Sequence, residues 1–402
     1  FKFSDLQATA ILEMKLQKLA GLERKKVEDE LKEIQNLIKN LKTLLASDNN
    51  ISNVVKKELL ELIRVYGDDR RTKIVKHGAK AFSAEDLVVD EESMLVFTKG
   101  GYIKRTNPNE YKRQRRGGVG VVDLNTKEED VVTKFLTTNT HSDLLFFTDK
   151  GKVYQIKMFD IPEGRRATRG KSIMNFLSIL QEEHITSILA MQKEIKKDTL
   201  SLMMVTKAGI AKKVSAENFY DVRRSGLIAI TLKGDDELIS ASFVRKGESV
   251  SIVTRSGQSI RFKESDIREM GRVASGVRAI KLKKGDRVIG AEVVHGEYEN
   301  PELLVLSASG YGKKTSLKEY KIQKRGGSGI KTAKVTSKTG NLIAMAIIDS
   351  VKDLEGEVVA VSQKGQVIRT GINEIPSLSR QTQGVRVMRL RSGDKVASMV
   401  LL

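Results

Sequence analysis

The chain repeats itself six times after residue 75, and this periodicity constrains the fold more than any other feature of the sequence. Each repeat holds an apolar run, then Thr or Ser, two further residues and a glycine. These glycines are Gly101, Gly151, Gly209, Gly257, Gly310 and Gly365. Because glycine readily takes the positive φ of a tight turn, each segment is predicted to form a two-stranded hairpin.

A second glycine recurs at a nearly constant distance, 19 residues after the first in five repeats and 17 in the third. These are Gly120, Gly170, Gly226, Gly276, Gly329 and Gly384. A further apolar strand is predicted to close each repeat, as at 185–190, 238–244, 288–294, 342–348 and 396–402. Four short strands per repeat predict a mainly β, six-bladed disc arranged around an axis. Two unrelated β-sandwiches are the alternative, but they would not keep the glycine spacing.

The first 75 residues differ in composition from the repeats. Residues 3–46 are rich in Leu, Lys and Glu, which favours a helix. Apolar residues recur there at heptad spacing, at Val27, Leu31, Ile34, Ile38, Leu41 and Leu45. This predicts one strand of a coiled coil, with an ordinary amphipathic helix as the alternative. After a break at 47–50, a second helix is expected from Val54 to Tyr66.

The predicted domains are therefore a helical segment, 1–75, and the repeat disc, 76–402, with repeats starting near 95, 144, 200, 250, 303 and 358. The chain opens at Phe1 without an initiator Met, so we expect a fragment of a longer protein.

Positive charge is concentrated in the repeats. The chain has 71 basic and 51 acidic residues among 402, a net charge of +20. Residues 1–75 hold 15 basic and 12 acidic residues, which leaves +17 for the repeats. Such a surplus favours a polyanionic partner, nucleic acid first. No apolar run is long enough to cross a membrane, and there is no cysteine, so we expect a cytoplasmic protein without a membrane partner.

The most distinctive segment is YKRQRRGGVGV, residues 111–121. Its arginines can fork onto phosphate oxygens, and its glycines let a backbone come close and offer N–H donors. A solvated flexible loop is the alternative. The fifth repeat carries a similar segment, QKRGGSG, with Lys324 in the place of Arg115 and Arg325 in the place of Arg116. Two such loops at equivalent positions favour phosphate binding.

A further series of basic residues stands four positions after the hairpin glycines: Arg105, Lys213, Arg261, Lys314 and Arg369, with Gln155 as the exception. Repetition about an axis is expected to set these charges around one edge of the disc. The alternative is that they are strand residues that merely face water. A curved basic edge suits duplex DNA held through its phosphates, with strong salt dependence and little base readout.

Enzyme motifs are absent from the sequence. The four histidines fall at non-equivalent positions of the repeats, and there is neither a cysteine nor an H-E-x-x-H motif. The segment Gly310-Tyr-Gly-Lys-Lys-Thr lacks the first glycine of a phosphate loop. We therefore expect no catalytic residue, no metal and no cofactor in this chain.

The segment QRRGGVG, Gln114 to Gly120, resembles the Gln-Arg-Arg-Gly-Gly-x-Gly box of the A subunits of bacterial DNA gyrases. Residues 7–23 and 66–74 resemble the junction that precedes the C-terminal domain in that family. The resemblance implies the end of a coiled coil followed by a six-bladed β-pinwheel with hairpin-invaded blades. It further implies a C-terminal fragment of one of the subunits of a type IIA DNA topoisomerase.

The resemblance also implies a function, which is to bind and wrap duplex DNA so that the holoenzyme can introduce negative supercoils in an ATP-dependent reaction. The family's catalytic tyrosine has no counterpart here, and ATP and Mg act elsewhere in the holoenzyme. The implied partners are double-stranded DNA, the rest of the dimeric gyrase A subunits, and the gyrase B subunits in an A2B2 assembly of the bacterial nucleoid. The alternatives are the equivalent domain of topoisomerase IV and a non-wrapping scaffold for acidic partners.

The box carries over residue by residue, and the basic residues around it and in the later repeats complete the predicted DNA contacts. They are Lys104, Arg105, Lys112, Arg113, Gln114, Arg115, Arg116, Gly117, Gly118, Gly120, Lys213, Arg261, Lys314, Lys324, Arg325 and Arg369.

Overall fold

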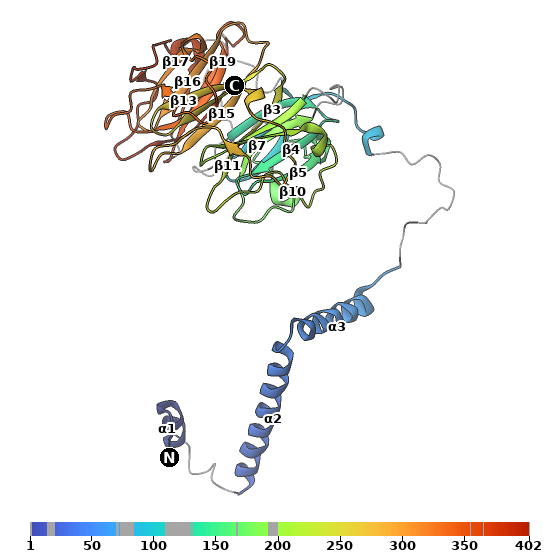
Figure 1. Cartoon of the computed structure of the whole chain (residues 1–402). Coiled ribbons are helices and arrows are strands. Elements are labelled where there is room, and N and C mark those ends of the chain that lie inside the picture. The colour runs from blue at the N-terminus through green and yellow to red at the C-terminus, as the bar shows by residue number, and fades with distance from the viewer. Residues whose placement is uncertain are drawn as a thin grey trace. The chain divides into compact units, whose positions relative to one another are not determined.

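The computed structural model describes residues 2–13, 21–69, 72, 84–108, 130, 132–165, 168–191, 200–353, 355–364 and 366–401. The chain divides into two compact units, Phe1–Ala81 and Phe82–Leu402. The described part of the first unit is helical, and the second is built from short antiparallel strands (Figure 1).

Three α-helices make up the described part of the first unit: α1 (Asp5–Leu12), α2 (Gly21–Leu45) and α3 (Asp48–Tyr66). The expected start of the second helix at Val54 is wrong, because α3 already begins at Asp48. The Ser47 hydroxyl accepts from the Asn49 backbone N–H at 3.2 Å and so caps α3. The Asn50 side chain donates to the Thr43 carbonyl at the end of α2. The polar residues that were expected to break the helix therefore cap one helix and start the next.

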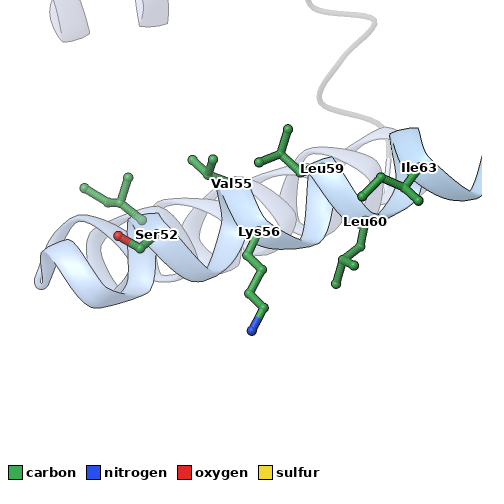
Figure 2. A pocket seen from close by; sticks show the side chains of 7 residues that line it. Ser52, Val55, Lys56, Leu59, Leu60 and Ile63 are labelled. Carbon is green, nitrogen blue, oxygen red and sulfur yellow. The ribbon is translucent and has the colours of Figure 1, made fainter. Parts of the chain in front are cut away.

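The heptad residues of α2 are exposed. From Val27 to Leu45 their side chains keep between 46% and 70% of their accessible surface. Helix α3 likewise projects Val55, Leu59 and Ile63 from one side (Figure 2). These apolar faces have no partner within the described residues of the helical unit, and the coiled coil stays a prediction.

The second unit consists of six sheets, the blades of the predicted disc. The strand nearest the axis, the inner strand, is β3 (Val132–Asn139), β7 (Ile185–Met191), β11 (Leu238–Arg245), β15 (Val288–Val294), β19 (Leu342–Asp349) and β23 (Val396–Leu401). The first hairpin strand is β1 (Glu92–Thr98), β4 (Asp143–Thr148), β8 (Leu200–Thr206), β12 (Ser249–Thr254), β16 (Pro301–Ser307) and β20 (Glu357–Ser362). The second hairpin strand is β2 (Tyr102–Thr106), β5 (Lys152–Lys157), β9 (Ile210–Ser215), β13 (Gln258–Lys263), β17 (Tyr311–Ser316) and β21 (Val367–Gly371).

In the first five blades the outer strand comes from the following repeat. These two-residue strands are β6 (Lys171–Ser172), β10 (Leu227–Ile228), β14 (Val277–Arg278), β18 (Ile330–Lys331) and β22 (Val385–Arg386). The second blade, for example, has the order β10-β5-β4-β7, although β10 belongs to the third repeat. This exchange ties consecutive blades together and confirms the hairpin-invaded architecture. In the sixth blade the described residues supply three strands, β21-β20-β23.

The inner strands close into a ring, because each contacts the next and β23 contacts β3 (Figure 1). The hydrophobic cores lie between neighbouring blades. One core joins Met203 and Val205 of the third blade to Ile252 and Ile260 of the fourth. Burial of apolar surface between blades therefore holds the ring together, and no blade has a complete core of its own.

The recurring Thr or Ser before each hairpin glycine has a structural role. In five of the six blades its hydroxyl accepts a backbone N–H from four residues on, as in Thr98 with Tyr102 at 3.1 Å and Ser307 with Tyr311 at 3.1 Å. Thr148 is the exception, because its buried hydroxyl has no hydrogen-bond partner among the described residues. The register of the sheet shifts at the same residue, which marks a β-bulge. The hairpin glycines within the described residues have positive φ, as predicted, for instance 77° at Gly101.

Candidate nucleic-acid interface

Basic side chains gather on the segments that lead into the outer strands. These segments, which we call the outer-edge loops, are 161–165 with 168–170, 220–226, 267–276, 320–329 and 375–384. Their exposed cations are Arg165, Arg169, Arg223, Arg224, Arg268, Lys321, Lys324 and Arg325, with Arg272 and Arg380 half-buried. Since every outer-edge loop crosses from one blade to the preceding one, the cations recur along the edge of the disc.

The outer-edge loop of the fifth repeat shows how such a loop is held. Arg325 donates from Nε to the Asp266 carbonyl at 2.8 Å and from Nη1 to the Arg278 carbonyl at 3.1 Å. The Gly326 N–H donates to the Ala279 carbonyl at 2.6 Å. These bonds fix the loop on the fourth repeat while the side chains of Lys324 and Arg325 stay exposed. A rigid, exposed pair of cations is suited to phosphate oxygens.

The outer strands add cations that the sequence prediction missed. Lys171, Arg278, Lys331 and Arg386 are all exposed, and the last three stand two residues after the second glycine of their repeats. This Gly-x-Arg or Gly-x-Lys spacing was visible in the sequence. It could not be placed on the edge of a blade because the strand pairs with a different repeat.

Two aromatic rings support arginines at this edge. The Arg169 guanidinium lies 3.7 Å from the centre of the Tyr102 ring, and that of Arg386 lies 5.5 Å from the centre of the Tyr311 ring. Arg386 also donates to the Tyr311 hydroxyl at 3.1 Å, which lowers the pKa of this tyrosine. The rings hold the guanidinium planes while leaving N–H donors for a ligand.

The box itself lies outside the described residues. This applies to Lys112, Arg113, Gln114, Arg115, Arg116, Gly117, Gly118 and Gly120. By sequence, QRRGGVG and QKRGGSG both begin 13 residues after the hairpin glycine of their repeat, at Gln114 and Gln323.

The basic series four residues after the hairpin glycines does not form a ring of free charges. Four of its members face a glutamate. Lys213 Nζ lies 2.5 Å from Glu264, Lys314 Nζ 3.6 Å from Glu302, and an Arg105 Nη atom 3.7 Å from Glu163. Arg369 Nε donates to Glu357 at 3.0 Å. The side chains of the first three cations are largely buried, and the paired carboxylates neutralise their charge.

Arg261 is the fifth member and is bound by neutral groups. Its Nε donates to the Ser249 hydroxyl at 2.9 Å and its Nη1 to the Leu317 carbonyl at 3.2 Å. Burial lowers the pKa of its guanidinium. The series therefore stabilises the junction between the hairpin and the following loop, where the spacing alone had suggested an exposed edge.

Lys104 needs a separate correction, because it is 1% exposed. Its ammonium donates to the carbonyls of Arg165 and Thr168 at 3.0 and 2.9 Å. Lys212 and Lys313 occupy the same position in the third and fifth blades and also donate to carbonyls of the adjoining outer-edge loop. A buried ammonium that satisfies loop carbonyls is a structural support for that loop, so we remove Lys104 from the predicted DNA contacts.

No metal site emerges from the part of the chain that the structure describes, where no group of three His, Asp or Glu side chains could hold an ion. Among the helices in the described ranges, none is long and apolar enough to cross a membrane.

The family model for the DNA gyrase C-terminal domain, a β-propeller, matches all six repeats, at residues 92–139, 142–190, 201–245, 248–295, 301–349 and 356–402. The chain belongs to this DNA gyrase C-terminal domain family. In the second to sixth repeats of this family's domain, each match spans one hairpin, one outer-edge loop and one inner strand. In the first repeat, the described residues supply the hairpin and the inner strand. The prediction of six repeats is confirmed.

Curated relatives extend the similarity to the helical unit. The chain is 39% identical over 399 residues to the DNA gyrase A subunit of Staphylococcus epidermidis and 38% identical to that of Staphylococcus aureus. Both alignments cover 99% of this chain and 44% of the relative. The chain thus spans less than half the length of the gyrase A subunits that it matches.

Solved structures support the same fold. The C-terminal domain of DNA gyrase A superposes with a TM-score of 0.62 at 28% identity, covering 77% of this chain and 99% of that domain. The C-terminal domain of DNA topoisomerase IV superposes with a TM-score of 0.64 at 23% identity, covering 78% of this chain and 94% of that domain. The second comparison bears on the fold alone.

Proposed function

We propose that this gyrase-family chain binds duplex DNA along its outer-edge loops and outer strands and bends it around the disc. The observation that carries the proposal is the recurrence of exposed cations in the outer-edge loops of successive repeats. The contacts would be made by Lys324 and Arg325, by Lys171, Arg278, Lys331 and Arg386, and by the box residues Lys112, Arg113, Gln114, Arg115, Arg116, Gly117, Gly118 and Gly120.

The chemistry favours phosphate contacts over base readout. The cations lie on loops and two-residue strands, and the described residues of the disc include no α-helix that could enter a major groove. Binding would then release counterions and weaken steeply with salt. Bending 20 to 30 base pairs by 40 to 90° costs about 1 to 6 kcal/mol, so contacts from several blades are needed to offset it.

In the larger protein, this wrap would supply a DNA segment for strand passage. We propose that the chain acts in a gyrase holoenzyme that introduces negative supercoils in an ATP-dependent reaction. Its partners would be the rest of the dimeric gyrase A subunits and the gyrase B subunits in an A2B2 assembly. The chain would contribute no catalytic group and no cofactor site, and ATP and Mg would act elsewhere. A bacterial cytoplasmic location on the nucleoid follows from this role.

The test is the topology of DNA bound to the 402-residue chain. Nicked circular DNA would be incubated with the protein, ligated, stripped of protein and analysed for linking number between about 50 and 300 mM salt. We expect a shift to positive linking number that fades as salt rises. Arg115→Ala/Arg116→Ala is expected to abolish the shift, and Lys324→Ala/Arg325→Ala to reduce it.

The matched control is Lys233→Ala/Lys284→Ala. Both lysines are exposed, and both lie in loops that lead into inner strands, outside the outer-edge loops and the outer strands. The control removes the same charge and should leave the shift unchanged. DNA binding without any shift would instead favour the topoisomerase IV domain or a non-wrapping scaffold. An equal loss in the control and the Lys324/Arg325 variant would show that net charge alone matters, against the proposed edge.

A further inference from the structure

A cavity lies at one end of the central channel, where hairpin turns meet the beginnings of the inner strands. Its volume is about 860 Å³. The first, third, fourth, fifth and sixth blades contribute to its lining, with residues such as Thr133, Ile239, Ile289, Ile343 and Ala397 at the starts of their inner strands. The cavity is thus a product of ring closure and belongs to none of the outer-edge loops.

The lining of this cavity carries an excess of positive charge. Its cations are Lys99, Lys207, Arg255, Arg287 and Lys395, and its one carboxylate is that of Glu237. Lys207 Nζ lies 2.7 Å from Glu237, so this pair is internally compensated. The other four cations come from the first, fourth and sixth blades and leave an uncompensated charge in a concave site.

Three of these cations have side chains available to a ligand. Lys99, Arg287 and Lys395 are exposed, and no hydrogen bond or ion pair of their side chains occurs within the described residues. Arg255 is held in place differently. With the Asn341 amide oriented so that its oxygen faces the guanidinium, Arg255 donates to it from Nη2 and Nε at 3.0 and 3.1 Å. Its second Nη group remains for a further acceptor.

Neutral donors complete the site. The side chains of Ser309, Ser337 and Ser398 belong to the lining. The Ser398 hydroxyl is buried and has no hydrogen-bond partner in the described part of the chain. A buried hydroxyl without a partner is costly, and an oxyanion or its water would satisfy it.

We propose that this channel-mouth site binds a small anion with several phosphate groups. Small-molecule pockets typically span about 300 to 1,000 Å³, and the cavity falls in this range, whereas a duplex has no room to enter it. Clustered Arg and Lys side chains in a concave site favour a compact polyanion over a single phosphate, since each added phosphate group meets another cation. Inorganic polyphosphate and the phosphate chain of a nucleotide share this chemistry.

The experiment is a calorimetric titration of the full chain with inorganic tripolyphosphate, in the absence of DNA. We expect saturable binding with a stoichiometry of one, at least tenfold tighter than that of orthophosphate and weaker at higher salt. Lys99→Ala/Arg287→Ala/Lys395→Ala should weaken tripolyphosphate binding at least tenfold. Since all three side chains are exposed, the melting temperature should change little, and the single variant Arg287→Ala gives a milder test should the triple variant fail to fold.

The matched control is Lys246→Ala/Lys263→Ala/Lys318→Ala. These lysines are exposed and lie at the opposite ends of the strands from the channel mouth. The control removes the same charge and should keep tripolyphosphate binding within twofold. Titration with adenosine triphosphate and with adenosine separates the two sources: binding equal to that of tripolyphosphate assigns the site to the phosphate chain alone, and tighter binding assigns it to a nucleotide.

A second measurement is independent of affinity. Tripolyphosphate should protect Lys99 and Lys395 from amine acylation, read by mass spectrometry, while Lys246 reacts as before. The proposal is overturned if the control loses binding as the site variant does, if the site variant binds normally, or if orthophosphate binds as tightly as tripolyphosphate. This test of the anion site can be distinguished from the test of DNA wrapping, because Lys324→Ala/Arg325→Ala should leave tripolyphosphate binding intact.

Discussion

Lys213 Nζ lies 2.5 Å from a carboxylate oxygen of Glu264, and both side chains are almost fully buried between β9 and the loop that follows β13. The same carboxylate accepts the Gly247 N–H at 3.2 Å. The pair shows why the charge counted along the chain overstates the charge on the surface. A basic residue that recurs in five of the six repeats can be part of the packing that stabilises the repeat.

This pair yields the first prediction. Lys213→Ala leaves the Glu264 carboxylate buried without its cation, which should lower the free energy of unfolding by about 3 kcal/mol. The DNA affinity of the folded fraction should not change. Urea unfolding and a DNA titration on the same sample measure both quantities. Lys213→Met/Glu264→Met should recover most of the stability, since it removes both charges; weaker DNA binding by the folded single variant would restore Lys213 to the interface.

Lys212 makes stability depend on pH. It is fully buried, and burial lowers the pKa of its ammonium to about 8. An unfolded lysine has a pKa of about 10.4, so the unfolded chain binds more protons between these two values. The contribution of Lys212 to the free energy of unfolding should therefore rise as pH increases from about 8 to about 10. Urea unfolding of the native chain and of Lys212→Met across this range isolates the effect, because other titrating groups cancel. Parallel curves for the two proteins would show that the ammonium keeps its ordinary pKa.

Glu292 has the opposite dependence. Its side chain lines the central channel and accepts the Ile347 N–H at 2.6 Å, and burial raises the pKa of its carboxyl to about 7. Between about pH 4.3 and pH 7 the folded chain then binds more protons than the unfolded chain. The contribution of Glu292 to the free energy of unfolding should therefore be lost as pH rises through this window. Glu292→Gln should remove that loss and be the more stable protein at pH 8. Thermal unfolding of both proteins at pH 5 and pH 8 tests this prediction. A variant less stable than the native chain at pH 8 would contradict the raised pKa of Glu292.

Gly329 is required where the fifth repeat gives its outer strand to the fourth blade. Its φ is 71°, and a Cβ there would stand 2.5 Å from the Ser259 carbonyl oxygen. Gly329→Ala should cost about 1 to 3 kcal/mol and weaken the pairing of β18 with β13. Gly271→Ala is the control, since its φ is not positive and a Cβ would meet nothing within 4 Å. The control should stay within about 0.5 kcal/mol. Melting temperatures compare the two, and equal effects would remove the special role of Gly329.

Several features of the fold could be predicted from the sequence because they depend on neighbours along the chain. The hairpin at Gly310 follows from a Ser, two residues and a glycine, since the Ser307 hydroxyl bonds the Tyr311 N–H within the same turn. The closing strand 288–294 was predicted with its observed ends, because its apolar run is bounded by polar turns. The six-fold count followed from repetition of these local units.

The tertiary structure decided which residues face one another. Spacing placed Arg105 and Lys213 at equivalent positions, but only the packing of each hairpin against the following repeat brings Glu163 and Glu264 to them. Spacing likewise could not show that Arg278 lies at the edge of the third blade, because its strand belongs to the next repeat. Local hydrogen bonds and steric limits act within a few residues, so the sequence pattern predicts them. The neutralisation of Arg105 and Lys213 depends on contacts between consecutive repeats some 50 residues apart, which form only when neighbouring blades pack together.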